Sequence, residues 1–356
     1  MIQSLYSIQK CARQLLAMIA CGALIASCDK VLDDGYGNCE VIEEYRVKFK
    51  YDYNMKYADA FAQEVRSVTL YAFGEDGKLA YQKTEEGDIL ASKDYTMLLE
   101  MAPGNYDFIA WAGLEDQSSF AVPVLTAGVS TMDDLTCRMN RIARSRSSVE
   151  SMDSVGYLKP LWHGKVEANL ASRASQSTPN IHIIEVPLVK NTNTLRVILQ
   201  QLSDKHVDVT DYKFVVIDDN GLMNYDNALM EDDSLAYYPY YTAQGSTEVE
   251  VGSRAGEELS VAVAELSVGR LVLDQNPRLT ITERANNDTV LSIPLIDYFK
   301  LCKMVAHYDI SDQEYLDRED EYNMTFFLDE NNRWMNTQII INEWIVRFSD
   351  AELEWQ

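Results

Sequence analysis

Short segments in which apolar and polar residues alternate, separated by turn residues, run through most of this chain. The clearest is YRVKFKY at 45–51, in which every second residue is aromatic or aliphatic and the others are basic. A similar segment at 106–112 follows the turn sequence Pro-Gly-Asn at 103–105. Successive strand residues point to opposite faces, so this alternation predicts half-buried strands. Strands roughly ten residues apart with turns between them are typical of β-sandwiches, so we predict an all-β fold.

The same signals place further strands in both halves of the chain. In the first half they predict strands at 65–73, 79–81, 95–101 and 165–170. In the second half they predict strands at 181–189, 195–202, 212–217, 259–264, 270–273, 279–283, 290–296 and 324–328, and a long one at 338–348. A short helix is predicted at 297–307, because its apolar residues share one face. The stretch 171–180, rich in Ser and Ala with one Pro, is typical of a linker. The sequence therefore predicts two sandwich domains in tandem, at 41–175 and 176–356, with short helical insertions.

The N-terminal 28 residues have the layout of an export signal. Lys10 and Arg13 precede an apolar run at 15–26, which ends in Ile-Ala-Ser before Cys28. A basic region, a short apolar region and small residues at the cleavage site are typical of a secretory signal peptide. The cysteine at this place is typical of a bacterial lipobox, so we predict a signal peptide at 1–27, diacylglycerol on Cys28 and a lipidated tether at 28–40. An ordinary signal peptide with an incidental cysteine is the alternative; the run is too short for a membrane span, which needs about 20 residues.

The net charge and the cysteine content limit which partners and which metal sites the chain can have. The chain has 56 acidic and 31 basic residues, for a formal net charge of −25. Such a surface repels phosphate backbones, which excludes nucleic acid as a partner. Cys39, Cys137 and Cys302 follow the lipobox without the spacing of a metal cluster. A Cys39–Cys137 disulfide and free buried thiols both remain open.

Catalytic motifs are lacking in the sequence. The four histidines, His163, His182, His206 and His307, are not spaced as metal ligands, and no nucleophile elbow or phosphate-binding loop is present. We therefore predict a non-enzymatic protein with no cofactor, metal ion or small-molecule substrate.

Three further features each admit a structural and a functional interpretation. The acidic turns 218–221 and 329–332 do not fit the register of a calcium loop, which favours solvated hairpin turns. Trp162, in the sequence LWHG at 161–164, is interpreted as a core residue rather than a binding corner. The run YYPYY at 237–241 is interpreted as a strand edge interrupted by proline, with a sugar-stacking platform as the alternative.

An ordered set of short segments resembles a known family. The segments are VKFKYDYNM (47–55), ADAF (58–61), VTLYAF (68–73), PGNY (103–106), AWA (110–112), LWHG (161–164), DNG (219–221), YDN (225–227) and IPLIDY (293–298). The most specific stretch is YLDREDEY (315–322), followed by TFFL (325–328) and INEW (341–344). In this order they resemble the lipoprotein anchor, or minor fimbrial subunit, family of Bacteroidales type V fimbriae. The resemblance runs from the lipobox almost to the C-terminus.

The resemblance implies a fold, a location and a partner. It implies two transthyretin-like β-sandwich domains and a surface-exposed lipoprotein of the outer membrane, which anchors a fimbrial shaft and can limit its length. The implied partner is the shaft subunit, a fimbrillin, joined by strand-mediated contacts. The strand at 338–348 and the tail 349–356 are the candidates for that contact, whereas the strand at 45–51 is expected to stay in its own sheet. A glycan-binding surface lipoprotein and a fimbrial tip or accessory adhesin are the alternatives.

Overall fold

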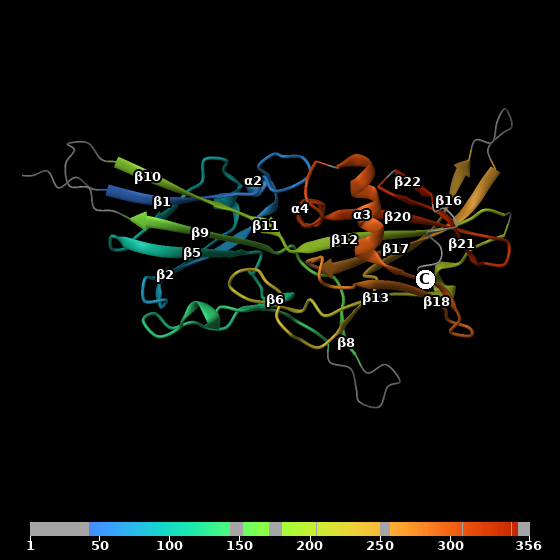
Figure 1. Cartoon of the computed structure of the whole chain (residues 1–356), viewed down its shortest axis with the longest axis horizontal. Coiled ribbons are helices and arrows are strands. Elements are labelled where there is room, and N and C mark those ends of the chain that lie inside the picture. The colour runs from blue at the N-terminus through green and yellow to red at the C-terminus, as the bar shows by residue number, and fades with distance from the viewer. Residues whose placement is uncertain are drawn as a thin grey trace, which may run out of the picture. The chain divides into compact units, whose positions relative to one another are not determined.

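The computed structural model describes residues 43–142, 152–170, 180–203, 205–249, 257–307, 309–342 and 344–347. Nearly all of them belong to one compact unit, formed by 45–171 and 183–356. Within the described residues the strands form five sheets, joined by short helices and loops (Figure 1). The predicted all-β sandwich fold with short helical insertions is confirmed.

The first sandwich pairs a three-stranded sheet with a five-stranded sheet. The three-stranded sheet has the order β10 (Asn180–Pro187), β1 (Glu43–Lys50), β4 (Met97–Leu99). The five-stranded sheet has the order β11 (Val189–Lys190), β9 (Trp162–Leu170), β5 (Gly104–Ala112), β2 (Ser67–Gly74), β3 (Leu79–Glu86). The alternation of β1 places Val47 and Phe49 in a core shared with Val68 and Leu70 of β2 and Phe108 of β5. The half-buried strand predicted at 45–51 is therefore confirmed as β1, which lies between two neighbouring strands.

The second sandwich is built from larger sheets. The six-stranded sheet has the order β16 (Tyr241–Val249), β17 (Glu257–Gly269), β12 (Thr192–Gln201), β20 (Glu321–Leu328), β21 (Trp334–Ile341), β22 (Trp344–Arg347). The five-stranded sheet has the order β19 (Thr289–Pro294), β18 (Arg278–Glu283), β13 (Tyr212–Asp218), β15 (Leu235–Tyr237), β8 (Asp153–Val155). A small third sheet has the order β14 (Leu222–Met223), β7 (Cys137–Met139), β6 (Phe120–Ala121). Their inward-facing residues join one large apolar core.

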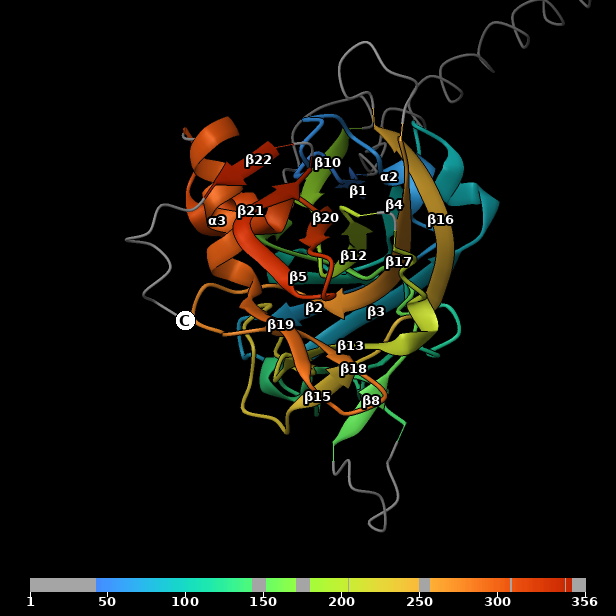
Figure 2. The same cartoon turned by 90° about the vertical axis from the view of Figure 1, so that its right-hand side faces the viewer.

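Helices are few and short in the described part of the chain. The α-helices are α2 (Phe61–Glu64), α3 (Leu295–Ala306) and α4 (Asp312–Arg318), and the 3₁₀ helices are η1 (Asp88–Ala91), η2 (Met132–Asp134) and η3 (Val209–Asp211). The helix predicted at 297–307 is confirmed as α3, which starts directly after Pro294 and lies against β22 (Figure 2). The α3 residue Phe299 stacks on Tyr322 of β20 at 3.7 Å between ring centroids. Among the described helices, none has the length and hydrophobicity of a membrane span.

Several sheets contain strands from distant parts of the chain. In the second sandwich β8 pairs in parallel with β15, and β7 pairs with β14 of the later sequence. In the first sandwich β11 pairs with β9, and β10 lies beside β1. The predicted domain boundary at 175/176 lies outside the described residues and stays a prediction.

Two of the predicted strands are wrong. The long strand predicted at 338–348 is a hairpin, in which β21 and β22 pair antiparallel with Ile341 opposite Trp344. Asn342 in the turn has a φ of +46°, and asparagine tolerates this left-handed conformation better than most residues. The strand predicted at 270–273 is a loop, because the side chain of Gln313 bonds its backbone: Nε2 donates to the Leu271 carbonyl at 3.1 Å and Oε1 accepts from the Leu273 N–H at 3.0 Å.

Candidate functional site

The predicted lipid attachment site lies outside the described residues. This applies to Cys28, to the tether at 28–40 and to the C-terminal tail at 349–356. The acylation of Cys28 and the export signal therefore stay predictions. Cys39 also lies outside the described residues, and Cys137 and Cys302 are buried free thiols.

Trp162 is part of the core of the first sandwich. Its ring is 2% exposed and meets the ring of Tyr51 edge-on, at 5.9 Å between centroids. The ammonium of Lys190 lies 5.7 Å from its ring centroid. The interpretation of Trp162 as a core residue is confirmed, so this side chain offers no surface to a ligand.

His163, the next residue, is buried and neutral. Its Nε2 lies 2.9 Å from the carbonyl oxygen of Tyr225, so the ring carries its proton on Nε2 and donates to that oxygen. The ring also packs against Trp111, at 4.6 Å between centroids. Burial lowers the pKa of His163 to about 4. His163 is therefore a structural link between β9 and the 225 loop, and a change near neutral pH does not charge it.

A buried ion pair lies where α4 meets the loop after β17. The Arg270 guanidinium donates from Nε to Asp317 Oδ1 at 2.9 Å and from Nη2 to Asp317 Oδ2 at 3.0 Å. Its Nη1 donates to the carbonyl of Asn227 at 2.6 Å, and Gln313 Nε2 donates to Asp317 Oδ1 at 3.0 Å. A bidentate arginine–carboxylate pair is both stronger and more directional than a single ion pair. This pair therefore fixes the position of α4 on the second sandwich.

The next residue of α4 reaches the first sandwich. The Arg318 guanidinium lies over the rings of Tyr53 and Tyr57, at 4.0 and 4.6 Å from their centroids. Its Nη1 donates to the carbonyl of Asp52 at 3.3 Å, and its own carbonyl accepts from the N–H of Met55 at 3.2 Å. One turn of α4 is thus attached to the loop that directly follows β1.

Lys190 forms a second connection at the same place. Its ammonium bonds Asp320, just after α4, and Glu64 of α2 at 3.2 Å. Burial alone would lower the pKa of Lys190, but the two carboxylates outweigh it and raise the pKa above the ordinary value. The lysine therefore stays charged and paired. We use the name junction cluster for Lys190, Arg270, Asp317, Arg318 and Asp320.

The acidic turn at 218–221 is buried, although the sequence predicts a solvated turn. Asp218 and Asn220 are 5% and 1% exposed, so the interpretation as a solvated turn is wrong. Asn220 donates to the carbonyl of Arg270 at 3.0 Å and accepts a short hydrogen bond from the Tyr237 hydroxyl, which holds the turn against the core. Burial raises the pKa of Asp218 to about 7. No cluster of three metal-ligating side chains occurs in the part of the chain that the structure covers.

The other acidic turn follows its prediction. Asp329 Oδ1 accepts from the N–H groups of Asn331 and Arg333, at 2.8 and 2.9 Å, in the exposed turn between β20 and β21. The solvated hairpin turn at 329–332 is confirmed.

The tyrosine run at 237–241 connects the two large sheets. Tyr237 is buried at the end of β15 and Tyr241 begins β16, with Pro239 between the strands. The run is therefore a connection between strands of two sheets, with the proline in that connection, and the sugar-stacking alternative stays open. Tyr240 and Tyr241 are exposed, and Tyr238 lines a pocket.

The C-terminal hairpin ends the six-stranded sheet. Asn342 in its turn is held by three hydrogen bonds: its N–H donates to the Asn323 carbonyl at 2.9 Å, its Oδ1 accepts from the Asn323 N–H at 2.7 Å and its Nδ2 donates to the Glu321 carbonyl at 3.1 Å. β22 is the last strand of the sheet among the described residues, and Ile345 on it is 55% exposed. An edge strand presents unpaired backbone groups to which another chain can add a strand.

The sequence matches the family described as fimbrillin-A associated anchor proteins Mfa1 and Mfa2, over residues 36–350. The chain belongs to this family. The minor fimbrium anchoring subunit Mfa2 of Porphyromonas gingivalis is 22% identical over 354 residues, which cover 95% of each chain. The family to which the resemblance pointed is thereby confirmed.

Solved structures of similar proteins share the fold of this family member. A candidate adhesin of Bacteroides thetaiotaomicron is 33% identical, with a TM-score of 0.76 over 88% of this chain and 100% of the relative. A candidate polysaccharide-binding protein of the same organism is 32% identical, with a TM-score of 0.72 over 87% and 100% of the two chains. The fimbrial anchor protein Mfa2 of P. gingivalis has the same fold, with a TM-score of 0.62 at 16% identity over 86% and 99% of the chains.

The junction cluster was not predicted from the sequence, although its location was marked. Asp317, Arg318 and Asp320 all lie in YLDREDEY at 315–322, the most specific stretch of the resemblance to the anchor family. No local pattern shows that these charges face Arg270 and Lys190, which lie 47 and 130 residues away. The sequence shows a cluster of charged residues in this segment, but it does not show which residues they contact.

Proposed function

We propose that this protein is a non-enzymatic lipoprotein that holds a type V fimbria on the outer membrane and limits its length. Acylated Cys28 forms the membrane end, and the edge of the C-terminal hairpin binds a fimbrillin shaft subunit by strand addition. Membership of the anchor family supports this proposal, as does the anchoring role in the name of the relative from P. gingivalis.

The structural observation that carries the proposal is the short route from β1 to the C-terminal edge. β1 follows the predicted tether, and the loop after it contacts Arg318 through Asp52 and Met55. α4 leads directly into β20, and β21 and β22 follow β20 in the same sheet. A subunit with a membrane at one end and a polymer at the other has to transmit force between them. The junction cluster supplies a bonded connection for this purpose.

Replacement of Cys28 tests the membrane end. In Cys28→Ala cells, we expect loss of acyl labelling from a palmitate analogue and release of the protein from the outer membrane fraction. Fimbriae are expected to be longer and to detach into the medium. Cys39→Ala is the matched control, since it removes a cysteine of the mature chain and is expected to leave labelling and fimbriae unchanged.

Two results would contradict the proposal. One is normal, surface-attached fimbriae in the Cys28→Ala strain at an unchanged level of protein. The other is immunogold labelling of this protein at fimbrial tips rather than at their bases, which would favour the tip adhesin alternative.

A further inference from the structure

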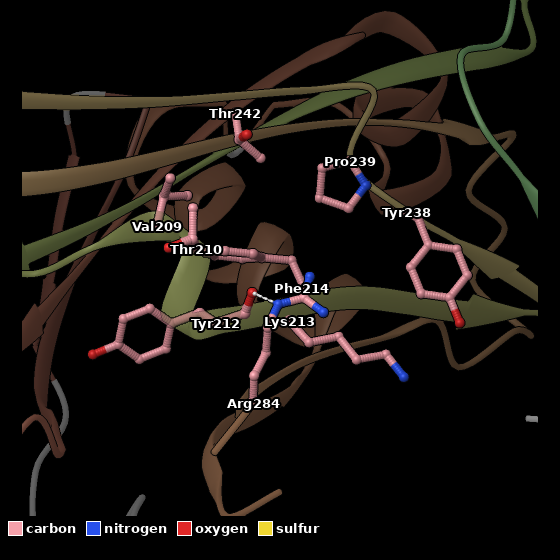
Figure 3. Close-up of a pocket in the computed structure, with 9 residues that line it drawn as sticks. All are labelled: Val209, Thr210, Tyr212, Lys213, Phe214, Tyr238, Pro239, Thr242 and Arg284. Atoms are coloured by element: carbon pink, nitrogen blue, oxygen red, sulfur yellow. Dashed lines mark hydrogen bonds between the residues drawn. The ribbon is translucent and has the colours of Figure 1, made fainter. Parts of the chain in front are cut away.

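A pocket of about 610 Å³ opens where the start of β13, the connection from β15 to β16 and the end of β18 meet. Tyr212 and Phe214 are among its lining residues, but their side chains are buried in the apolar core beneath it. Tyr238 and Pro239 lie across from them, and Arg284 points into the space between (Figure 3). Ligand sites are typically concave, with volumes of roughly 300–1,000 Å³ and mainly apolar walls with few polar groups. The pocket has the size of such a site, although about half of its wall is polar.

The two charged residues of the pocket are both cations. Arg284 is held in place, because its Nε donates to the carbonyl of Tyr212 at 3.1 Å and its backbone N–H donates to the carbonyl of Asp211 at 2.8 Å. Among the described residues, none accepts a hydrogen bond from the Nη atoms of Arg284, so these donors remain available to a ligand. Lys213 lies on the same side, with its Nζ 5.7 Å from the ring centroid of Tyr238.

The positive charge of this pocket is unexpected in a chain with so many acidic residues. With 56 acidic and 31 basic residues, an average surface site would contain more carboxylates than cations. A second pocket of about 310 Å³ follows that expectation, since Glu75, Asp107 and Glu167 are among its lining residues. The described lining of the first pocket has no carboxylate. Outside this lining, the carboxylate of Asp208 accepts from the backbone N–H and the hydroxyl of Thr210, and the carboxylates of Asp211 and Glu283 lie near Tyr212.

We propose that this pocket binds a carboxylated sugar residue of a glycan. The planar guanidinium of Arg284 matches a carboxylate with two parallel hydrogen bonds. The rings of Tyr238 and Pro239 supply an apolar wall for the carbon–hydrogen face of a sugar ring. A small inorganic anion would contact the guanidinium but leave the apolar wall uncovered. A uronic or sialic acid would bind the guanidinium through its carboxylate and cover the wall with its sugar ring. The exposed Tyr240 beside the pocket extends the surface for the next sugar of the chain.

This inference is independent of the proposed membrane anchoring and is tested by direct binding. The full-length protein in detergent is measured by isothermal titration calorimetry against oligogalacturonides and sialylated oligosaccharides. Each ligand is paired with its neutral counterpart, the methyl ester or the desialylated glycan. We expect the carboxylated forms to bind, the neutral forms to bind at least about tenfold more weakly, and the affinity to fall with added salt.

Variants identify the residues that carry the binding. Arg284→Gln is expected to weaken binding of the carboxylated ligand about tenfold, and Tyr238→Ala is expected to weaken both ligand forms. Arg278→Gln is the matched control, since it removes a cation from the same sheet outside the pocket and should leave the affinity unchanged. Equal circular dichroism spectra and melting temperatures show that the variants are folded.

The proposal is overturned by any of three results. They are the absence of binding to every carboxylated ligand, equal affinity for acid and neutral forms, and unchanged affinity in a folded Arg284→Gln protein. Each of these results leaves the Cys28 experiment unaffected, so the pocket and the membrane anchor succeed or fail separately.

Discussion

Asp317→Asn is expected to destabilise the protein strongly, because it breaks the bidentate pair with Arg270. The side chains of Arg270 and Asp317 are only 16% and 8% exposed, and two hydrogen bonds of 2.9 and 3.0 Å join them. Removing one partner of a buried ion pair costs about 3–5 kcal/mol, since the other charge stays buried without its counter-ion. Arg270 keeps its bond to the Asn227 carbonyl, so we expect the lower end of this range, about 3 kcal/mol.

The neighbouring pair on the same helix supplies the control. Glu314 accepts from Arg318 Nε at 2.7 Å across one helical turn, and its side chain is 29% exposed. Glu314→Gln makes the same chemical change as Asp317→Asn, but loss of a partly exposed pair at this spacing costs only about 0.5 kcal/mol. The free energy of unfolding is measured by urea denaturation at pH 7, with tryptophan fluorescence as the signal.

A double-mutant cycle separates the pair from other effects of the substitution. Arg270→Gln combined with Asp317→Asn should cost less than the sum of the two single changes, because neither charge is then left alone. If Asp317→Asn costs no more than Glu314→Gln, or if the two single changes are additive, the pair does not hold the junction cluster together. The junction cluster would then not form a bonded route between β1 and the C-terminal edge.

Three further predictions concern the turns and the edge. Asp218→Asn should stabilise the protein at pH 8 by about 4 kcal/mol and much less at pH 4. The folded state keeps a proton on Asp218 up to about pH 7, so the natural protein loses stability as the pH rises from 4 through 7. A pH series of urea titrations measures this difference. Asn342→Ala should lower the free energy of unfolding by about 2 kcal/mol, because alanine loses the side-chain hydrogen bonds and is also strained at the positive φ. Asn342→Gly should lower it less, because glycine loses the hydrogen bonds without the strain. Thermal melts of both variants distinguish the two contributions. Ile345→Lys should reduce recovery of a fimbrillin-like subunit in pull-downs from solubilised outer membrane. The control Val124→Lys, on an exposed loop, should not reduce it. Equal recovery with both variants would exclude the β22 edge as the contact.

Most strands could be predicted from the sequence, because their signal is local. The alternation at 45–51 and the turn before 106–112 specify β1 and β5 without reference to the rest of the chain. The turn of the C-terminal hairpin was not predicted because no glycine stands beside Asn342 and the apolar run is interrupted only briefly there. β16 was not predicted because its sequence, YTAQGSTEV, has few large apolar residues; pairing with β17 and hydrogen bonds between Gln244 and the backbone of Val207 and Val209 hold it in place.

The functional residues were harder to predict, since their roles depend on distant partners. The turn at 218–221 has the composition of a solvated turn, and only its contacts with Arg270 and Tyr237 show why it is buried. Similarly, Arg318 contacts Asp52 across 266 residues of sequence. Cys28 is the reverse case, because a lipobox is entirely local and can be recognised without any fold.

The exchange of strands between distant parts of the chain has a consequence for biosynthesis. A chain grows from its N-terminus, and segments fold as soon as their partners are available. β9 and β1 gain their outer neighbours β11 and β10 only when residues 180–190 have been made, and β8 waits for β15 at 235–237. Until then the growing chain exposes strand edges, which favour aggregation. Chaperones that bind nascent or exported chains are therefore expected to stay on this protein until well past its midpoint.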